Sequence, residues 1–130
     1  MIVDSSALLA VVFGEPNFEV FAESIDAAEA CKMSAATYVE VMMVAEGRGS
    51  DRAVRHVELL IRDGGFGIEP VTAEQAFLAV RGFSIYGKGR HAAGLNFGDC
   101  FSYALAKALD EPLLFKGDDF RKTDITPAIA

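Results

Sequence analysis

Five acidic residues at four places in this sequence are the side chains best suited to chemistry. Asp4 ends a short apolar run, and Glu40 is the only charged residue in a stretch of Ala, Val, Met, Thr and Tyr. Asp99 follows a glycine at the start of an apolar helical pattern, and Asp118 and Asp119 follow a second glycine. An uncompensated buried carboxylate is costly, so Glu40 in particular predicts a nearby cation or strong hydrogen bonds.

Oxygen ligands of this kind predict a hard divalent cation. Mg²⁺ and Mn²⁺ prefer carboxylates and water, and they act on phosphodiesters by activating water and screening developing charge. The spacing leaves open whether one ion or two are bound. A zinc site is not expected, because Cys31 and Cys100 stand alone as buried free thiols and only His56 and His91 remain.

Each acid also has a structural interpretation. Asp4 could cap the following helix, and Glu40 could pair with an arginine at a helix rim. Asp99 in a first helical turn is favoured by the helix dipole, and Ser102, three residues later, could orient its carboxylate. The acids of the glycine turn could simply be solvated. Structural roles alone do not readily explain why acids at all four places should fall at one edge of a predicted sheet.

The periodicity predicts an α/β fold in which helices flank a central, mostly parallel sheet, as one domain over residues 1–130. Strands are expected near residues 1–4, 31–34, 67–71 and 113–115, with a short edge strand near 124–126. Helices are expected near residues 7–13, 18–30, 35–46, 51–63, 72–86 and 97–109. Ser5 or Ser6, Ser34 and Thr72 are the expected helix caps.

Composition restricts the function. The 130 residues are 52% hydrophobic, but no apolar run approaches the roughly 20 residues that span a bilayer, so we expect no membrane contact and a cytoplasmic location. The net charge of −7 opposes a broad nucleic-acid-binding face. A bound metal would reduce that charge, and Lys88, Arg90 and His91 concentrate basic groups that could hold RNA phosphate.

Several blocks of the sequence resemble a known family. These blocks are Met1 to Ala7, the embedded Glu40, Tyr86 to His91 with Leu95 to Cys100, and Leu113 to Phe120. Together they are similar to PIN-domain toxins of the VapC type, over essentially the whole chain. The resemblance implies a PIN-like three-layer fold and a magnesium- or manganese-dependent endoribonuclease, the toxic half of a type II toxin–antitoxin pair.

The resemblance also implies residue roles and partners. Asp4, Glu40 and Asp99 match the acids of the family; Asp119 is favoured over the adjacent Asp118 as the fourth, because it precedes a phenylalanine. Ser6 matches a supporting hydroxyl residue. The implied partners are RNA, a small DNA-binding antitoxin and a second copy of the chain. The apolar helix around Glu40 offers surplus hydrophobic surface for such a homodimer.

Two other functions share features with this sequence. A phosphoacceptor receiver domain has a similar length and an acidic magnesium site, but it needs adjacent acids after the first strand, and Asp4 has no acidic neighbour. A catalytically inactive PIN-like binding module is disfavoured by acids at all four places.

Overall fold

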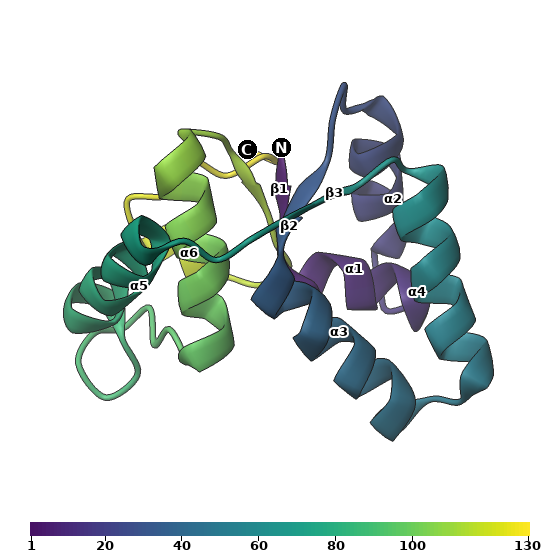
Figure 1. Ribbon diagram of the computed structural model, residues 1–130, viewed down its shortest axis with the longest axis horizontal. Coiled ribbons are helices and arrows are strands. Elements are labelled where there is room, and N and C mark those ends of the chain that lie inside the picture. Colours follow the sequence, from purple (N-terminus) through teal and green to yellow (C-terminus); the bar gives the residue numbers. More distant parts are fainter.

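The computed structural model describes all 130 residues as a four-stranded parallel sheet with helices on both faces (Figure 1). The strands are β1 (Ile2–Val3), β2 (Lys32–Ser34), β3 (Gly67–Glu69) and β4 (Leu113–Leu114), in the spatial order β3-β2-β1-β4. The helices are α1 (Ser5–Val12), α2 (Phe18–Ala27), α3 (Ala35–Arg48), α4 (Asp51–Asp63), α5 (Ala73–Tyr86) and α6 (Phe97–Leu109), with a 3₁₀ turn η1 (Phe120–Lys122). The predicted α/β class is confirmed.

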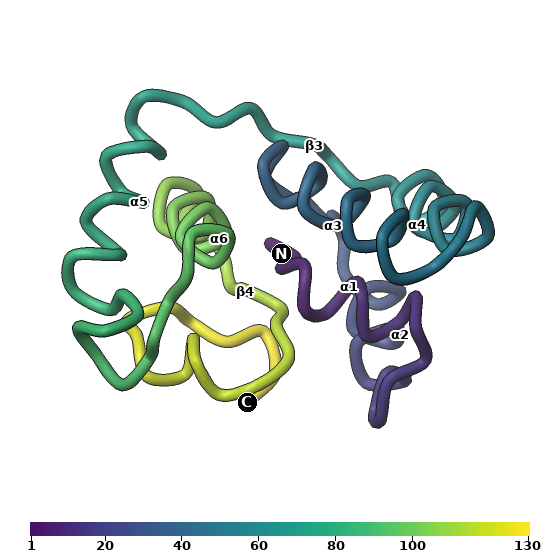
Figure 2. The backbone as a smooth tube through the Cα atoms, turned by 90° about the horizontal axis from the view of Figure 1, so that it is seen from below, coloured from purple at the N-terminus to yellow at the C-terminus, as the bar shows by residue number.

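Alternation along the neighbouring strands β1 and β4 divides the core. Ile2 and Leu113 point to the side covered by α5 and α6, whereas Val3 and Leu114 point to the side of α1 to α4. All four side chains are buried. Because side chains of a strand alternate between faces, two residues per strand are enough to supply both half-cores. Figure 2, viewed from below, places the start of the chain between α6 and α3.

Helix caps fix where the helices begin. Ser34 accepts a hydrogen bond from the N–H of Ala36, and Thr72 accepts one from the N–H of Gln75, as the sequence predicts. The first helix is different. Its cap is Asp4, which accepts from the N–H of Ser6, and not Ser5 or Ser6. Asp4 therefore has the expected structural role, whatever chemistry it also serves.

Three other expectations about the elements were wrong. The segment near 124–126 forms no strand, and only an isolated bridge joins Leu113 to Pro127. The second helix ends at Ala27, because the backbone is already extended at residue 28. The helix around Glu40 is not buried nearly all round, since Val39 is 53% exposed and Met43 67% exposed.

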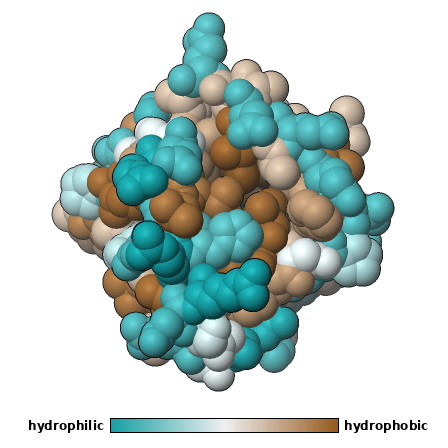
Figure 3. Space-filling model, turned by 90° about the vertical axis from the view of Figure 1, so that its right-hand side faces the viewer, coloured by the Kyte–Doolittle hydropathy of each residue, from teal (hydrophilic) through white to brown (hydrophobic).

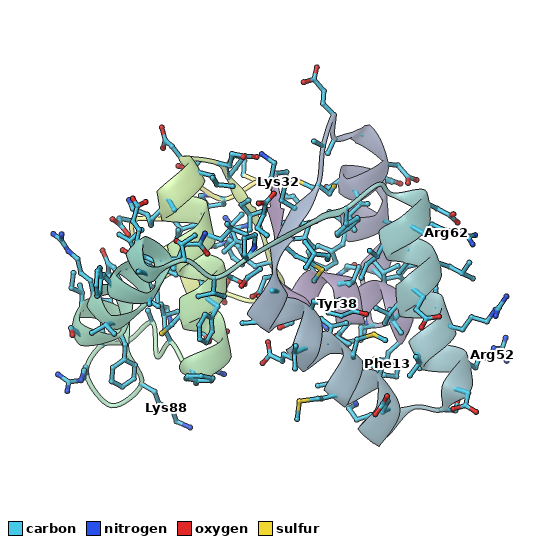
Figure 4. All side chains as sticks on the ribbon, in the orientation of Figure 1. Phe13, Lys32, Tyr38, Arg52, Arg62 and Lys88 are labelled. Atoms are coloured by element: carbon cyan, nitrogen blue, oxygen red, sulfur yellow. The ribbon has the colours of Figure 1, made fainter.

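The outer helix α4 carries its charges toward solvent. Arg52 and Arg62 point away from the body of the molecule, while Phe13 and Tyr38 lie on the inner side of the helices (Figure 4). The guanidinium of Arg48 lies 4.5 Å from the centroid of the Phe13 ring. Figure 3 shows this side of the protein, where hydrophilic side chains only partly cover the hydrophobic atoms beneath. No helix has the length and apolar character needed to cross a membrane.

Candidate active site

The carboxyl ends of the parallel strands bring the acidic residues to one edge of the sheet. Asp4 follows β1, α3 with Glu40 follows β2, and the turn with Asp119 follows β4. Asp99 lies in the first turn of α6, which packs against α3. In open α/β sheets this edge is where ligands bind.

Asp4 is the most completely fixed of the acids. Its side chain is buried, and one carboxylate oxygen, Oδ2, accepts from the N–H of Ser6 at 3.1 Å and from the Ser6 hydroxyl at 2.6 Å. The other oxygen, Oδ1, accepts from the hydroxyl of Ser102 at 2.6 Å. The backbone N–H of Lys116 donates in turn to Ser6 Oγ at 3.0 Å, so the loop after β4 helps to hold the Ser6 hydroxyl against Asp4.

These contacts correct the expectation for Ser102. Its hydroxyl donates to Asp4 and not to Asp99. Ser6, by contrast, supports Asp4 directly, as the resemblance implies.

Asp99 combines a structural bond with an electrostatic penalty. Its Oδ2 accepts from the backbone N–H of Asn96 at 3.0 Å, and the Asn96 side chain accepts from the Asp99 N–H, which forms a capping box. Burial nevertheless raises the pKa of Asp99 to about 6. The hydrogen bond from Asn96 acts against this rise, and the charges of Asp4, Glu40 and Asp119 add to it. Asp99 therefore interacts electrostatically with each of the other three acids.

Glu40 lies across from the start of α6. Burial raises its pKa, a hydroxyl contact from Ser5 opposes the rise, and the charge of Asp4 adds to it. A Cβ atom placed on Gly98 would come within 2.9 Å of Glu40 Cδ, so the glycine gives the carboxylate its room. Sequence reasoning missed this contact, although a glycine directly before an acid in a helix is a visible signal.

The fourth acid comes from an exposed turn. The charge of Asp119 is among the causes that raise the pKa of Asp99. The choice of Asp119 over Asp118 as the fourth acid stays a prediction. Both side chains are solvent-exposed.

The basic residues lie in the loop between α5 and α6. Lys88 points away from the body of the molecule (Figure 4). The Arg90 guanidinium lies 5.4 Å from the centroid of the Phe83 ring. Phe83 and Phe97 both line an apolar groove between α5 and α6. His91 packs its ring edge-on against Tyr86, and its Nδ1 accepts from the N–H of Ala93 at 3.0 Å. His91 thus has a structural role within the loop.

The donor set fits a hard divalent cation. All four side chains offer oxygen, and the raised pKa values of Glu40 and Asp99 show that these carboxyls lack a compensating charge. No three His, Cys, Asp or Glu side chains stand close enough to form a ready-made metal cage. Cys31 and Cys100 are buried free thiols, as the sequence predicts. A divalent cation held at this edge would therefore have to complete its coordination with water oxygen.

Comparison with known proteins identifies the family. The sequence profile of the PIN domain matches residues 1–125. The chain is 45% identical to Ribonuclease VapC30 of Mycobacterium tuberculosis, covering 96% of this chain and 95% of the relative. It is also 45% identical to Ribonuclease VapC42 of the same organism, covering 98% of both, and 43% identical to Ribonuclease VapC of Mycolicibacterium smegmatis, covering 96% and 97%.

Solved structures agree on the fold. The crystal structure of Mycobacterium tuberculosis VapC20, described as a Sarcin-Ricin loop cleaving toxin, superposes with a TM-score of 0.77 at 16% identity, covering 96% of this chain and 95% of that one. A toxin-antitoxin complex from Klebsiella pneumoniae gives a TM-score of 0.71 at 19% identity, covering 95% and 92%. Together with the profile match and the identity to the mycobacterial relatives, these findings show that the chain belongs to the PIN-domain family and is of the VapC type.

Proposed function

We propose that this protein is the toxin of a type II toxin–antitoxin system and that it hydrolyses RNA phosphodiester bonds with Mg²⁺ or Mn²⁺. The observation that carries the proposal is the gathering of four acids at the carboxyl edge of the sheet, where burial and the charges of the other three raise the pKa of Asp99. An inactive binding module has no need to concentrate negative charge in this way, because the repulsion destabilises the fold. Membership of the PIN family excludes the receiver-domain alternative.

The environment of each acid indicates its role in the proposed reaction. Asp4 and Asp99 would be the principal ligands of the cation, and Glu40 and Asp119 would complete its coordination or orient the attacking water. A bound divalent cation would activate water and screen the charge that develops on the phosphate. Three donors leave about one lone-pair position of the Asp4 carboxylate free, on Oδ1, and Ser6 and Ser102 hold the carboxylate in one orientation. Hydrolysis in this scheme needs no covalent enzyme intermediate.

RNA binding must overcome the chain's net charge of −7. Lys88 and Arg90 are exposed in the loop before α6, and we propose that they contact phosphates at the mouth of the site, with His91 at the same loop. A small DNA-binding antitoxin is the proposed regulatory partner. It would inhibit by covering the site or by placing a basic side chain among the carboxylates, which compensates the same charge as a metal.

The apolar surface beside the site supports the proposal of a homodimer. Val39 and Met43 on α3 and Phe97 on α6 are exposed, and they line a groove that also contains Glu40 and Gly98. Phe97 packs edge-on against Phe101 but is still 81% exposed, which is unusual for a large aromatic residue. A second copy of the chain is the occupant that we propose for this surface, with both active sites next to the interface.

RNA cleavage with matched variants tests the proposal. Purified protein should cut a labelled structured RNA with Mg²⁺ or Mn²⁺, excess chelator should stop the reaction, and added metal should restore it. Asp4→Asn should lower the rate at least about 100-fold, because an amide cannot replace the charged ligand. Asp118→Asn is the matched control and should retain most activity. Cleavage that persists in chelator, or that survives Asp4→Asn, would contradict the metal mechanism.

A further inference from the structure

A buried hydroxyl pair joins α3 and α6 behind the acidic site. Thr37 and Ser102 are each 1% exposed, and their hydroxyl oxygens lie 3.3 Å apart. Ser102 Oγ also lies 2.6 Å from Asp4 Oδ1. No pattern in the sequence assigns a role to Thr37, which lies three residues before Glu40.

Proton counting fixes the direction of these bonds. Ser102 has a single hydroxyl proton, and an O···O distance of 2.6 Å is typical of a hydroxyl that donates to a carboxylate. That proton is therefore committed to Asp4. In the contact between the two hydroxyls, Thr37 must be the donor and Ser102 the acceptor. The result is a chain of two hydrogen bonds, from Thr37 to Ser102 and from Ser102 to Asp4, which we call the relay.

The relay connects the elements that carry three of the acids. Thr37 lies three residues before Glu40 on α3, and Ser102 lies three residues after Asp99 on α6, so each hydroxyl is about one helical turn from an acid. Asp4 follows β1. A hydrogen-bonded chain that spans these elements limits both the rotation of the Asp4 carboxylate and the separation of the two helices.

We propose that Thr37 and Ser102 are positioning residues that hold Asp4, and with it the spacing of the carboxylates, in the geometry that binds a divalent cation. The inference rests on the proposed metal-dependent function. Neither residue touches the cation in this scheme. Residues that orient metal ligands commonly change metal affinity 10- to 100-fold when they are replaced.

The alternative is that Thr37 only fills space in the core. Replacing Thr37 by Val keeps the shape and removes the hydroxyl, while replacing it by Ser keeps the hydroxyl and removes a methyl group. A space-filling role predicts that Val is tolerated and that Ser is the damaging change, because it leaves a small cavity. A positioning role predicts the opposite order for metal binding.

Metal titration of four proteins decides between these roles. Mn²⁺ affinity is measured by the electron paramagnetic resonance of the free ion for wild type, Thr37→Val, Thr37→Ser and Ser102→Ala, with thermal melts in chelator to check folding. We expect about 10- to 100-fold weaker binding for Ser102→Ala, about 3- to 10-fold for Thr37→Val, and less than about 2-fold for Thr37→Ser. If Ser102→Ala does not fold, the Thr37 pair decides.

The outcomes separate the two proposals. Wild-type affinity in folded Thr37→Val, or equal losses in Thr37→Val and Thr37→Ser, would overturn the relay while leaving the nuclease proposal intact. A wild type that binds Mn²⁺ but cuts no RNA would instead refute the nuclease proposal and leave the relay standing. A wild type that binds no Mn²⁺ at millimolar concentration would refute both.

Discussion

Neutralising Asp99 should stabilise the metal-free protein. A rise of the Asp99 pKa from 3.8 to about 6 corresponds to at most about 3 kcal/mol of unfavourable free energy when the carboxyl is ionised. The side chain is partly exposed, so solvent screening reduces this to about 1.5 kcal/mol. Asp99→Asn also loses about 0.5 kcal/mol of favourable interaction with the helix N-terminus, but keeps an acceptor for the Asn96 N–H.

The net gain is about 1 kcal/mol, which raises the melting temperature of a chain of this size by about 3 to 4 °C. Its pH dependence follows from the sign of the shift. Near pH 3, below the unfolded pKa of 3.8, Asp99 is mostly protonated in both the folded and unfolded states, and wild type carries almost no penalty. The penalty on wild type grows as pH rises from 3.8, because the unfolded carboxyl ionises first, and it is complete once pH passes the folded pKa of about 6. The advantage of Asp99→Asn should therefore be nearly absent at about pH 3 and complete above about pH 6.

Magnesium should reverse the order of stability. At a concentration 100 times the wild-type Kd, binding stabilises wild type by about 2.7 kcal/mol. If Asp99→Asn weakens Kd 100-fold, its gain is only about 0.4 kcal/mol. Thermal melts across pH and magnesium concentration measure both effects. A lower melting temperature for metal-free Asp99→Asn, with an unchanged magnesium shift, would mean that Asp99 serves only as a helix cap and would remove it from the site.

Three further changes test other parts of the molecule. Gly98→Ala should displace Glu40 and lower the RNA cleavage rate about 10-fold or more, while the melting temperature stays equal or rises. Gly47 is a helical glycine with open space around it, so the control Gly47→Ala should leave cleavage unchanged. Arg90→Ala should weaken RNA binding and reduce the slope of log affinity against log salt by about one, with Mn²⁺ affinity unchanged; an equal loss in the control Arg62→Ala on α4 would argue against a specific phosphate contact. Met43→Glu should convert a dimer to a monomer in light scattering while Val20→Glu on α2 does not, and a wild type that is already monomeric at micromolar concentration would refute the interface.

Local sequence patterns predicted most of the elements because their causes are local. Ser34 and Thr72 cap helices through bonds to residues two or three positions later, and the period of apolar residues fixed the type of each helix. The helix around Glu40 was misjudged for a physical reason. Val39 and Met43 are apolar on an outward face, and composition cannot distinguish a buried surface from one that awaits a partner.

The site was predictable in its residue types and not in its contacts. The strand ends indicated where the carboxylates gather, but the partner of Ser102 depends on how α6 is rotated against β1, across 98 residues of sequence. Thr37 meets Ser102 across 65 residues, so no periodicity marks it. The capping box of Asp99 is the exception, since Asn96 three residues earlier makes it visible in the sequence.

The division of the core by two-residue strands has a consequence for the protein's motions. One hydrophobic cluster lies under α1 and α3, the elements beside Asp4 and Glu40, and the other lies under α6, which carries Asp99. The carboxylates therefore span the seam, the boundary between these two clusters. Such units can open separately, at less cost than global unfolding. A cation held across the seam must be released before either unit opens, and its binding free energy is added to the cost of opening. Metal binding should therefore slow hydrogen exchange of amides throughout α5 and α6, including amides far from any carboxylate.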